Sequence, residues 1–257
     1  MAVIGVMDSG SGGLSVLREI RKVLPEASYI YYADNANCPY GTKSREFILQ
    51  RCHSICELLL SRGADAIVIA CNTATAVAIS SLREKYDVPF VGMEPAVKPA
   101  AMGTQSGVIG VLATAGTLSA SKYLDMKDRY SDGVEVVEHV GEGFVELVER
   151  GVLSGPEAEK TCAASLMPLL EKGADIIVLG CTHYPFLRPV MEKICAERGY
   201  RGVRFIDPAP AVARRLIQVL EEKGIGDKSG VAACPVPGSV ELLSSGPREV
   251  LEYLYSK

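Results

Sequence analysis

The chain has 257 residues, long enough for one large α/β domain or for two domains of about 100–150 residues each. Hydrophobic residues make up 48% and charged residues 23% of the sequence, and the formal net charge is −4, which is typical of a globular protein and argues against a nucleic-acid partner. The longest apolar runs fall well short of the roughly 18–20 residues that a membrane-spanning helix requires.

The N-terminal segment from Met1 to Met7 contains neither a basic stretch nor a small-residue cleavage motif. Eight cysteines are spread along the chain without regular spacing. Without a secretion signal, such cysteines are more typical of reduced thiols than of a disulfide framework. We therefore expect a cytoplasmic protein that does not bind membranes.

Short β-branched runs alternate along the chain with longer amphipathic stretches. In chain order the predicted strands are Val3–Met7, Tyr29–Ala33, Ala66–Ala70, Phe90–Gly92, Val108–Leu112, Val134–His139, Ile176–Leu179 and Arg204–Ile206. Helical patterns fill most of the intervals. This order predicts parallel sheets joined by right-handed helical crossovers.

Two of these helical patterns show residues that typically begin or end a helix. The segment from Ser44 to Arg62 opens on a serine that can cap a helix and closes just before Gly63. A later pattern covers Val212–Glu222, and a stretch rich in glycine and proline follows it, from Gly224 to Pro247. These last residues are too few for a domain of their own, and we expect them to extend the first one.

An internal repeat gives the domain organisation. Residues 63–71, Gly-Ala-Asp-Ala-Ile-Val-Ile-Ala-Cys, return as residues 173–181, Gly-Ala-Asp-Ile-Ile-Val-Leu-Gly-Cys, and two further segments repeat in the same order. The repeat therefore indicates that one structural unit is duplicated in the chain. The sequence predicts two pseudo-symmetric parallel-sheet α/β domains, residues 1–97 with 209–257 and residues 98–208, with an active site in the cleft between them.

The first predicted strand runs into the glycine-rich segment Asp8-Ser9-Gly10-Ser11-Gly12-Gly13, which precedes a helical pattern from Leu14. Backbone N–H groups at such a helix start can hold an anion, for which a carboxylate would suffice. The segment lacks the lysine of a P-loop and the last glycine of a dinucleotide-binding fingerprint. A plain tight turn with Asp8 as a helix cap explains the same residues equally well.

Cys71 and Cys181 occupy equivalent strand ends of the repeat, where ligands bind in open α/β sheets. A twofold relation between the domains would place the two thiols on opposite walls of one cleft. Inverting a carbon centre needs a base on one face and an acid on the other, and two thiols supply both roles. Taken alone, either cysteine would be interpreted as a small buried apolar residue. His183, two residues after Cys181, is a neighbour that can lower a thiol pKa.

The remaining cysteines carry less information. Cys52 and Cys56 lie on one predicted helix with His53 between them, but no second ligand pair with zinc-like spacing follows. Core packing is therefore favoured over metal binding. We expect structural roles for Cys38, Cys162, Cys195 and Cys234.

Four motifs together resemble the glutamate racemases of the aspartate/glutamate racemase superfamily, which supply D-glutamate for bacterial peptidoglycan. They are residues 8–13 (Asp-Ser-Gly-Ser-Gly-Gly), Asp34 with residues 39–44 (Pro-Tyr-Gly-Thr-Lys-Ser), residues 71–74 (Cys-Asn-Thr-Ala) and residues 180–185 (Gly-Cys-Thr-His-Tyr-Pro). The resemblance covers nearly the whole chain. It implies racemisation of glutamate by two opposed cysteines, with no cofactor and no metal, in a homodimer.

The resemblance also implies roles for individual residues. Cys71 and Cys181 work on opposite faces of the substrate, with Asp8 and His183 as their polar partners. Asp34 and Glu149 are further acidic residues that influence the site. Glutamate would be bound by Asp8, Ser9, Tyr40, Gly41, Asn72, Thr73, Thr182 and His183.

Other functions fit parts of this pattern. The same fold could act on aspartate or a hydantoin, or decarboxylate a malonate with one cysteine, although the second cysteine argues against decarboxylation. A two-lobed amino-acid-binding protein would also place a ligand between two domains. The paired thiols and the absence of a signal motif argue against that alternative.

Overall fold

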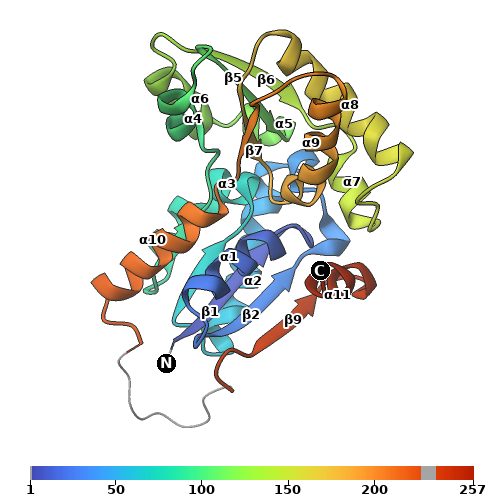
Figure 1. Ribbon diagram of the computed structural model, residues 1–257. Helices are drawn as coiled ribbons and strands as arrows, with labels where there is room; N and C mark the ends of the chain where they lie inside the picture. The colour runs from blue at the N-terminus through green and yellow to red at the C-terminus, as the bar shows by residue number, and fades with distance from the viewer. Residues whose placement is uncertain (1, 227–235) are drawn as a thin grey trace.

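Two parallel β-sheets form the centres of the computed structural model, which describes residues 2–226 and 236–257 (Figure 1). The first sheet has the strand order β4 (Phe90–Gly92), β3 (Ala66–Ile69), β1 (Val3–Asp8), β2 (Ser28–Ala33) and β9 (Val240–Ser244). The second sheet has the order β6 (Glu135–Val140), β5 (Val108–Ala113), β7 (Ile176–Gly180) and β8 (Arg204–Ile206). Every strand pair in both sheets is parallel.

Helices fill the connections and cover both faces of each sheet. The helices of the first half are α1 (Leu14–Val23), α2 (Arg45–Ser61), α3 (Asn72–Lys85), α4 (Val97–Gly103), α5 (Ala115–Leu118) and α6 (Ser121–Tyr130). Those of the second half are α7 (Phe144–Glu149), α8 (Pro156–Glu171), α9 (Arg188–Glu197), α10 (Ala209–Glu222) and α11 (Glu249–Tyr255). Three short 3₁₀ helices lie in loops, η1 (Asn35–Asn37), η2 (Tyr40–Thr42) and η3 (Tyr184–Leu187). None of the described helices has the length and apolar composition needed to cross a membrane.

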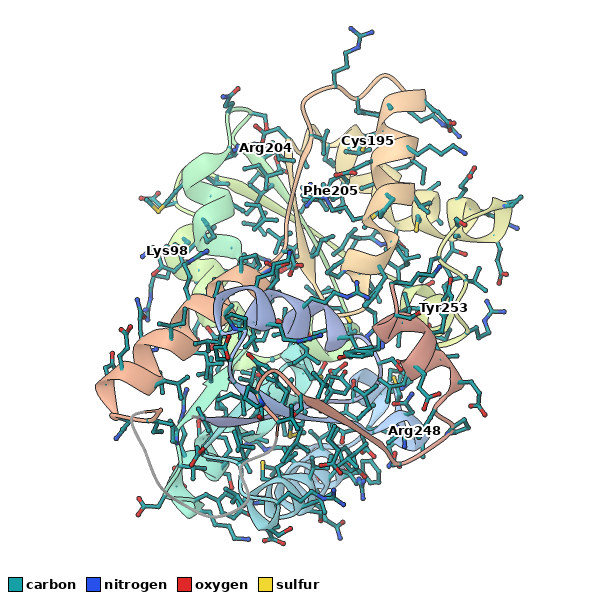
Figure 2. The ribbon with its side chains drawn as sticks, turned by 60° about the horizontal axis from the view of Figure 1, so that its bottom comes forward. Lys98, Cys195, Arg204, Phe205, Arg248 and Tyr253 are labelled. Carbon is teal, nitrogen blue, oxygen red and sulfur yellow. The ribbon has the colours of Figure 1, made fainter. Side chains whose placement is uncertain are left out.

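Successive side chains along a strand point to opposite faces of the sheet. Apolar side chains on both faces explain why helices cover both faces of each sheet. On β1, Ile4 and Val6 point into the core beneath α1 and α10, whereas Met7 points into the core beneath α2 and α3. All three side chains are fully buried, as expected for a parallel sheet between two helical layers. The second sheet is covered in the same way, and Cys195 on α9 and Phe205 on β8 belong to its core (Figure 2).

The two-domain α/β fold is confirmed, and so are all eight predicted strands, to within one or two residues. Ser44 caps α2 as predicted, because its hydroxyl accepts a hydrogen bond from the Phe47 N–H at 3.2 Å. The residue boundaries of the domains stay a prediction. Cys52, Cys56, Cys162 and Cys195 are buried free thiols, as a structural role requires, and Cys234 lies outside the described residues.

One strand was missed by the sequence analysis. β9 pairs with β2 in parallel, with Val240 opposite Tyr29, and becomes the edge of the first sheet. Four of its five residues are only partly buried, and Glu241 is exposed. They follow a stretch rich in glycine and proline, so the sequence there shows no clear strand pattern. α10 packs on α1, which returns the chain to the first sheet after β8 (Figure 1).

The repeat is preserved in backbone detail. Gly63 follows α2 and Gly173 follows α8, and both have φ of +88°. Asp65 then accepts a hydrogen bond from the Val3 N–H at 2.9 Å, while Asp175 accepts one from the Gln105 N–H at 2.7 Å. In each half, the glycine follows a helix and the aspartate hydrogen bonds to the backbone at the central strand: Asp65 to the first residue of β1, and Asp175 to a residue just before β5.

This geometry predicts equal costs for two matched substitutions. Gly63→Ala and Gly173→Ala should each lower the free energy of unfolding by about 1–2 kcal/mol, because a side chain disfavours the left-handed backbone. Neither added Cβ would meet a neighbouring atom, so the loss reports conformation alone. Gly103→Ala, at a helical position with ordinary contact distances, is the control and should not lower stability, because alanine is favoured over glycine in a helix. Urea unfolding measures all three; equal stability of the two variants and wild type would contradict the account.

Candidate active site

The candidate active site lies where the carboxyl ends of the two sheets face each other. Cys71 follows β3 and begins α3, and Cys181 follows β7. Side chains of both halves enclose a cavity with free volume of only about 10 Å³, room for roughly one water molecule. Its walls include Ser9, Tyr40, Gly41, Cys71, Asn72, Thr73, Thr114, Thr117, Val145, Cys181, Thr182 and His183.

Cys71 is held by the start of α3. Its sulfur accepts a hydrogen bond from the Ala74 N–H at 3.3 Å, and its thiol lies 3.7 Å from the Ser9 hydroxyl oxygen. Burial, reinforced by the negative charge of Asp8, raises the pKa of Cys71 to about 12. Cys71 is therefore a protonated thiol at neutral pH.

Asp8 lies directly behind this cavity and is fully buried. Its Oδ2 accepts hydrogen bonds from the Gly13 N–H at 2.8 Å and the Thr182 hydroxyl at 3.3 Å. The hydrogen bond from Gly13 stabilises the glycine-rich turn, which is the alternative explanation that the sequence offered for Asp8. Burial raises the pKa of Asp8 to about 6, although the charge of His183 opposes the rise.

Several buried polar atoms at this site have no hydrogen-bond partner among the described residues. They are Oδ1 of Asp8 and both side-chain amide atoms of Asn72. Unpaired buried polar groups are costly, and native proteins pair nearly all of them. A polar ligand bound against Asn72 would satisfy the two amide atoms of that side chain.

His183 links Cys181 to Glu149. Its Nδ1 lies 3.7 Å from the Cys181 sulfur, and its Nε2 lies 2.7 Å from Oε1 of Glu149. Burial alone would lower the pKa of His183, but hydrogen bonds with Cys181, Cys38 and Glu149 outweigh burial and raise it well above its usual value. Burial would raise the pKa of Glu149, yet the contacts with His183 and Ser11 hold it below its usual value. The pair is an imidazolium beside a carboxylate.

Asp34 lies outside the cavity and acts on its wall. It is fully buried and accepts hydrogen bonds from the Tyr40 hydroxyl at 2.6 Å and from two nitrogens of Arg51 at 2.9 and 2.8 Å. Tyr40 in turn lines the cavity. Asp34 therefore positions the segment that carries Tyr40.

Asp34→Asn should show a pH-dependent loss of stability. Burial would raise the pKa of Asp34, but hydrogen bonds from Arg51 and Tyr40 hold it below its usual value. The stability that this carboxylate contributes is present above the unfolded-state pKa of about 4 and is lost as pH falls through the lower folded-state value. At neutral pH the free energy of unfolding of the variant should be about 1–3 kcal/mol lower than that of wild type, because Arg51 loses its charged partner.

Urea unfolding at neutral and acidic pH checks this expectation, and the difference between variant and wild type should shrink below about pH 4. Asp125→Asn, at an exposed position on α6, is the matched control and should change stability by less than about 0.5 kcal/mol. A difference that grows on acidification would refute this assignment.

The structure brings most of the predicted site residues together. Nine of them line the cavity: Ser9, Tyr40, Gly41, Cys71, Asn72, Thr73, Cys181, Thr182 and His183. Asp8, Glu149 and Asp34 lie behind the cavity, where they contact Thr182, His183 and Tyr40 respectively.

Other site residues were missed by the sequence analysis. Thr114 lines the cavity and lies 3.1 Å from the Thr73 hydroxyl oxygen; it follows β5 as Ser9 follows β1, so the repeat contained a signal for it. Cys38, expected to be structural, lies instead beside Glu149 and His183. No sequence pattern marks that position.

The sequence profile of the Asp/Glu/Hydantoin racemase family matches residues 4–216. A glutamate racemase of Pseudomonas aeruginosa is 50% identical over 236 residues, 91% of this chain and 87% of that protein. One of Ectopseudomonas mendocina is 46% identical over 98% of this chain and 88% of that protein. The crystal structure of Escherichia coli glutamate racemase with L-glutamate and the activator UDP-MurNAc-Ala has TM-score 0.84 at 34% identity, covering 99% of this chain and 94% of that one.

Proposed function

The chain belongs to the Asp/Glu/Hydantoin racemase family and is an amino-acid racemase, and from this premise we propose that it interconverts L- and D-glutamate with Cys71 and Cys181 as opposed acid/base groups. The observation that carries the proposal is the meeting of the two thiols in one cavity from equivalent strand ends. The substrate rests on the glutamate racemases to which the chain is similar.

In the proposed reaction, one sulfur removes the α-proton as a thiolate while the other, as a thiol, returns a proton to the opposite face. Cys71 is the thiol in the resting site, because its pKa is raised to about 12. His183, with its raised pKa, is placed to hydrogen bond to the Cys181 sulfur in its anionic form. After each turnover the former thiolate carries the substrate's α-proton, and the former thiol, which gave its proton to the α-carbon, is a thiolate; the reverse reaction restores the first state.

The polar groups around the thiols would hold the amino acid. The side-chain amide of Asn72 has its donor and acceptor atoms unpaired, and the start of α3 presents N–H groups that favour a carboxylate. Asp8 lies behind the cavity in the conformation described, and its buried negative charge would pair with the substrate ammonium group once the site opens. In a site that excludes water, such preorganised partners act more strongly than in solution.

The cavity is too small for an amino acid in the conformation described, with a free volume of about 10 Å³. We infer that the two halves of the site move apart to admit glutamate and then close on it. Closure would remove water from the α-carbon and bring both thiols against it.

Racemisation of purified protein tests the proposed function. Protein dialysed against a chelator, without added cofactor, is incubated with L- or D-glutamate in deuterated buffer, and optical rotation and deuterium at the α-carbon are followed. We expect both enantiomers to approach a racemic mixture and to exchange the α-proton. Parallel incubations with aspartate test the substrate. Activity confined to aspartate would refute the glutamate assignment, and tight binding without turnover would favour a binding protein.

We also propose that the D-glutamate serves peptidoglycan synthesis in the cytoplasm, as in the family that the motifs resemble. All seven described cysteines are free thiols, which is consistent with a reducing compartment. The homodimer and the cofactor-independent reaction stay predictions.

A further inference from the structure

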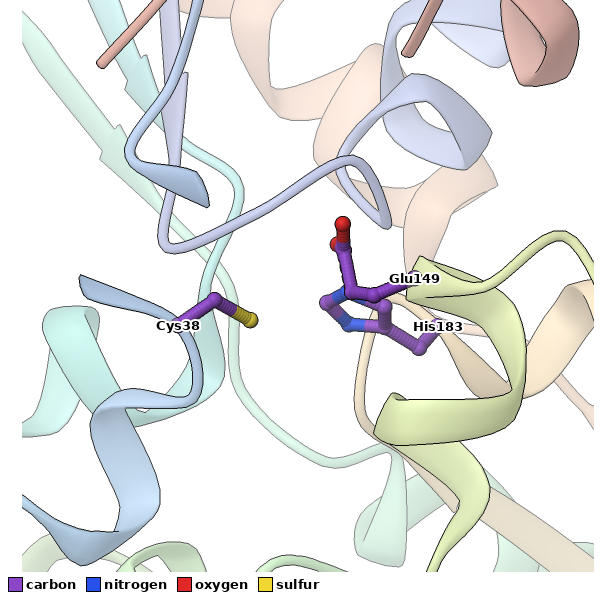
Figure 3. A group of neighbouring side chains, drawn as sticks. All are labelled: Cys38, Glu149 and His183. Atoms are coloured by element: carbon purple, nitrogen blue, oxygen red, sulfur yellow. Dashed lines mark hydrogen bonds and ion pairs between the residues drawn. The ribbon is translucent and has the colours of Figure 1, made fainter. Parts of the chain in front are cut away.

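Three potential metal ligands meet beside the active site from three separate segments. Cys38 lies in the loop between η1 and η2, Glu149 ends α7, and His183 follows β7. One thiol sulfur, one carboxylate oxygen and one imidazole nitrogen all lie within 4.8 Å of one another. Figure 3 shows the Cys38 side chain pointing across to Glu149 and His183.

This donor set suits zinc. Zinc binds cysteine sulfur at about 2.3 Å and histidine nitrogen or carboxylate oxygen at about 2.0–2.2 Å, and reactive zinc sites have three protein ligands and one open position. We propose that Cys38, Glu149 and His183 form a binding site for zinc or a similar divalent ion, whose occupancy inhibits the enzyme. Binding is independent of the proposed function, whereas inhibition rests on it.

Hydrogen bonds from neighbouring residues hold the Glu149 carboxylate in place, as the groups that surround metal ligands do. Its Oε2 accepts hydrogen bonds from the Ser11 hydroxyl at 3.1 Å and the Asn35 amide at 3.2 Å. The Ser11 N–H donates to Oε1. Such partners orient a ligand and raise the affinity for the metal.

A hollow that neither catalytic thiol lines lies beside this site. Its volume is about 220 Å³, Cys38 and Glu149 line it, and it shares Pro39 and Val145 with the cavity of the thiols. Cys38 is half-buried and does not line the cavity between Cys71 and Cys181. Cys38 therefore faces the proposed metal site and not the cavity between the two catalytic thiols.

Occupancy would tie the two halves of the site together. Cys38 lies between η1 and η2 in the half that contains Cys71, whereas Glu149 and His183 lie in the half that contains Cys181. An ion bound to all three would oppose the opening that admits glutamate, and it would separate Glu149 from His183 Nε2, now 2.7 Å apart. Inhibition would follow without any contact between the ion and the substrate.

Cobalt(II) is the spectroscopic probe for the site. Chelator-treated full-length protein should bind one equivalent of cobalt with a thiolate-to-cobalt charge-transfer band, and one equivalent of zinc should remove the band. Cys38→Ala should lose the band and bind zinc more than about 100-fold more weakly. Cys71→Ala and Cys195→Ala, which remove an active-site thiol and a core thiol outside the trio, should keep the band.

Zinc inhibition supplies the second measurement. Wild-type racemisation should fall in proportion to zinc occupancy, and the Cys38→Ala enzyme should be insensitive at the same zinc concentration. A band that survives Cys38→Ala but disappears in Cys181→Ala would overturn the proposal by placing the ion at the catalytic thiols. Failure of wild-type protein to bind cobalt would overturn it as well. A stoichiometric band in a protein that does not racemise glutamate would support the site and refute only the proposed function.

Discussion

Cys71→Ala and Cys181→Ala are each expected to abolish racemisation in both directions, with a loss of at least about 10³-fold in kcat/KM. A positioned acid/base group contributes about 10²–10⁴-fold to a reaction, and inversion needs both groups in every turnover. The remaining thiol can still reach the α-carbon from its own face. Each variant should therefore incorporate deuterium without inversion from one enantiomer at most, and the two variants should prefer opposite enantiomers.

Optical rotation and mass spectrometry in deuterated buffer measure these losses. Cys162→Ala removes a buried thiol of the second-sheet core and is the control, since it should keep full turnover if the variant folds. Far-ultraviolet circular dichroism verifies folding for each protein. Racemisation retained in either active-site variant would rule out the two-thiol mechanism.

Asp8→Asn should lower kcat/KM for glutamate by about two to three and a half orders of magnitude. The proposed contact pairs a buried carboxylate with the substrate ammonium, and removing one member of a buried charge pair costs about 3–5 kcal/mol, with 1.4 kcal/mol for each tenfold change. Because the pKa of Asp8 is raised to about 6, the wild-type kcat/KM should fall as pH drops below about 6. The Asn variant should lack this dependence.

The variant should remain folded. A carboxyl group whose pKa is raised by burial disfavours the folded state at pH above that value, and Asn can still accept the hydrogen bond from Gly13. Its thermal unfolding temperature at neutral pH should therefore not fall. Asp87→Asn, at an exposed position, is the control and should leave both kcat/KM and its pH dependence unchanged. An unaltered pH profile in Asp8→Asn would exclude this role.

The strand ends that carry the site were predictable because each follows an apolar run that only a buried strand explains. Val3–Asp8 and Ile176–Gly180 are buried throughout, and the sequence alone shows where their apolar character stops. The repeat then related Cys71 to Cys181 without any knowledge of the fold. Strand propensity and the internal repeat together were enough to predict which strand ends carry the site.

The remaining parts of the site depend on contacts that no local pattern encodes. Cys38 gains its neighbours only because α7 brings Glu149 across from the other half of the molecule. The position of Asp34 behind Tyr40 depends on hydrogen bonds from Arg51, which lies more than one turn after the start of α2. Such groupings arise from tertiary packing, and periodicity carries no information about them.

β9 has a consequence for the order in which the protein can be assembled on the ribosome. The outer edge of β2 is paired only with this strand, whose residues are among the last to be synthesised. The second sheet, complete at Ile206, can form while β2 still presents unpaired N–H and C=O groups, which invite pairing with other nascent chains. A chain released before Val240 would keep that edge open, so premature termination would yield aggregation rather than a smaller working enzyme.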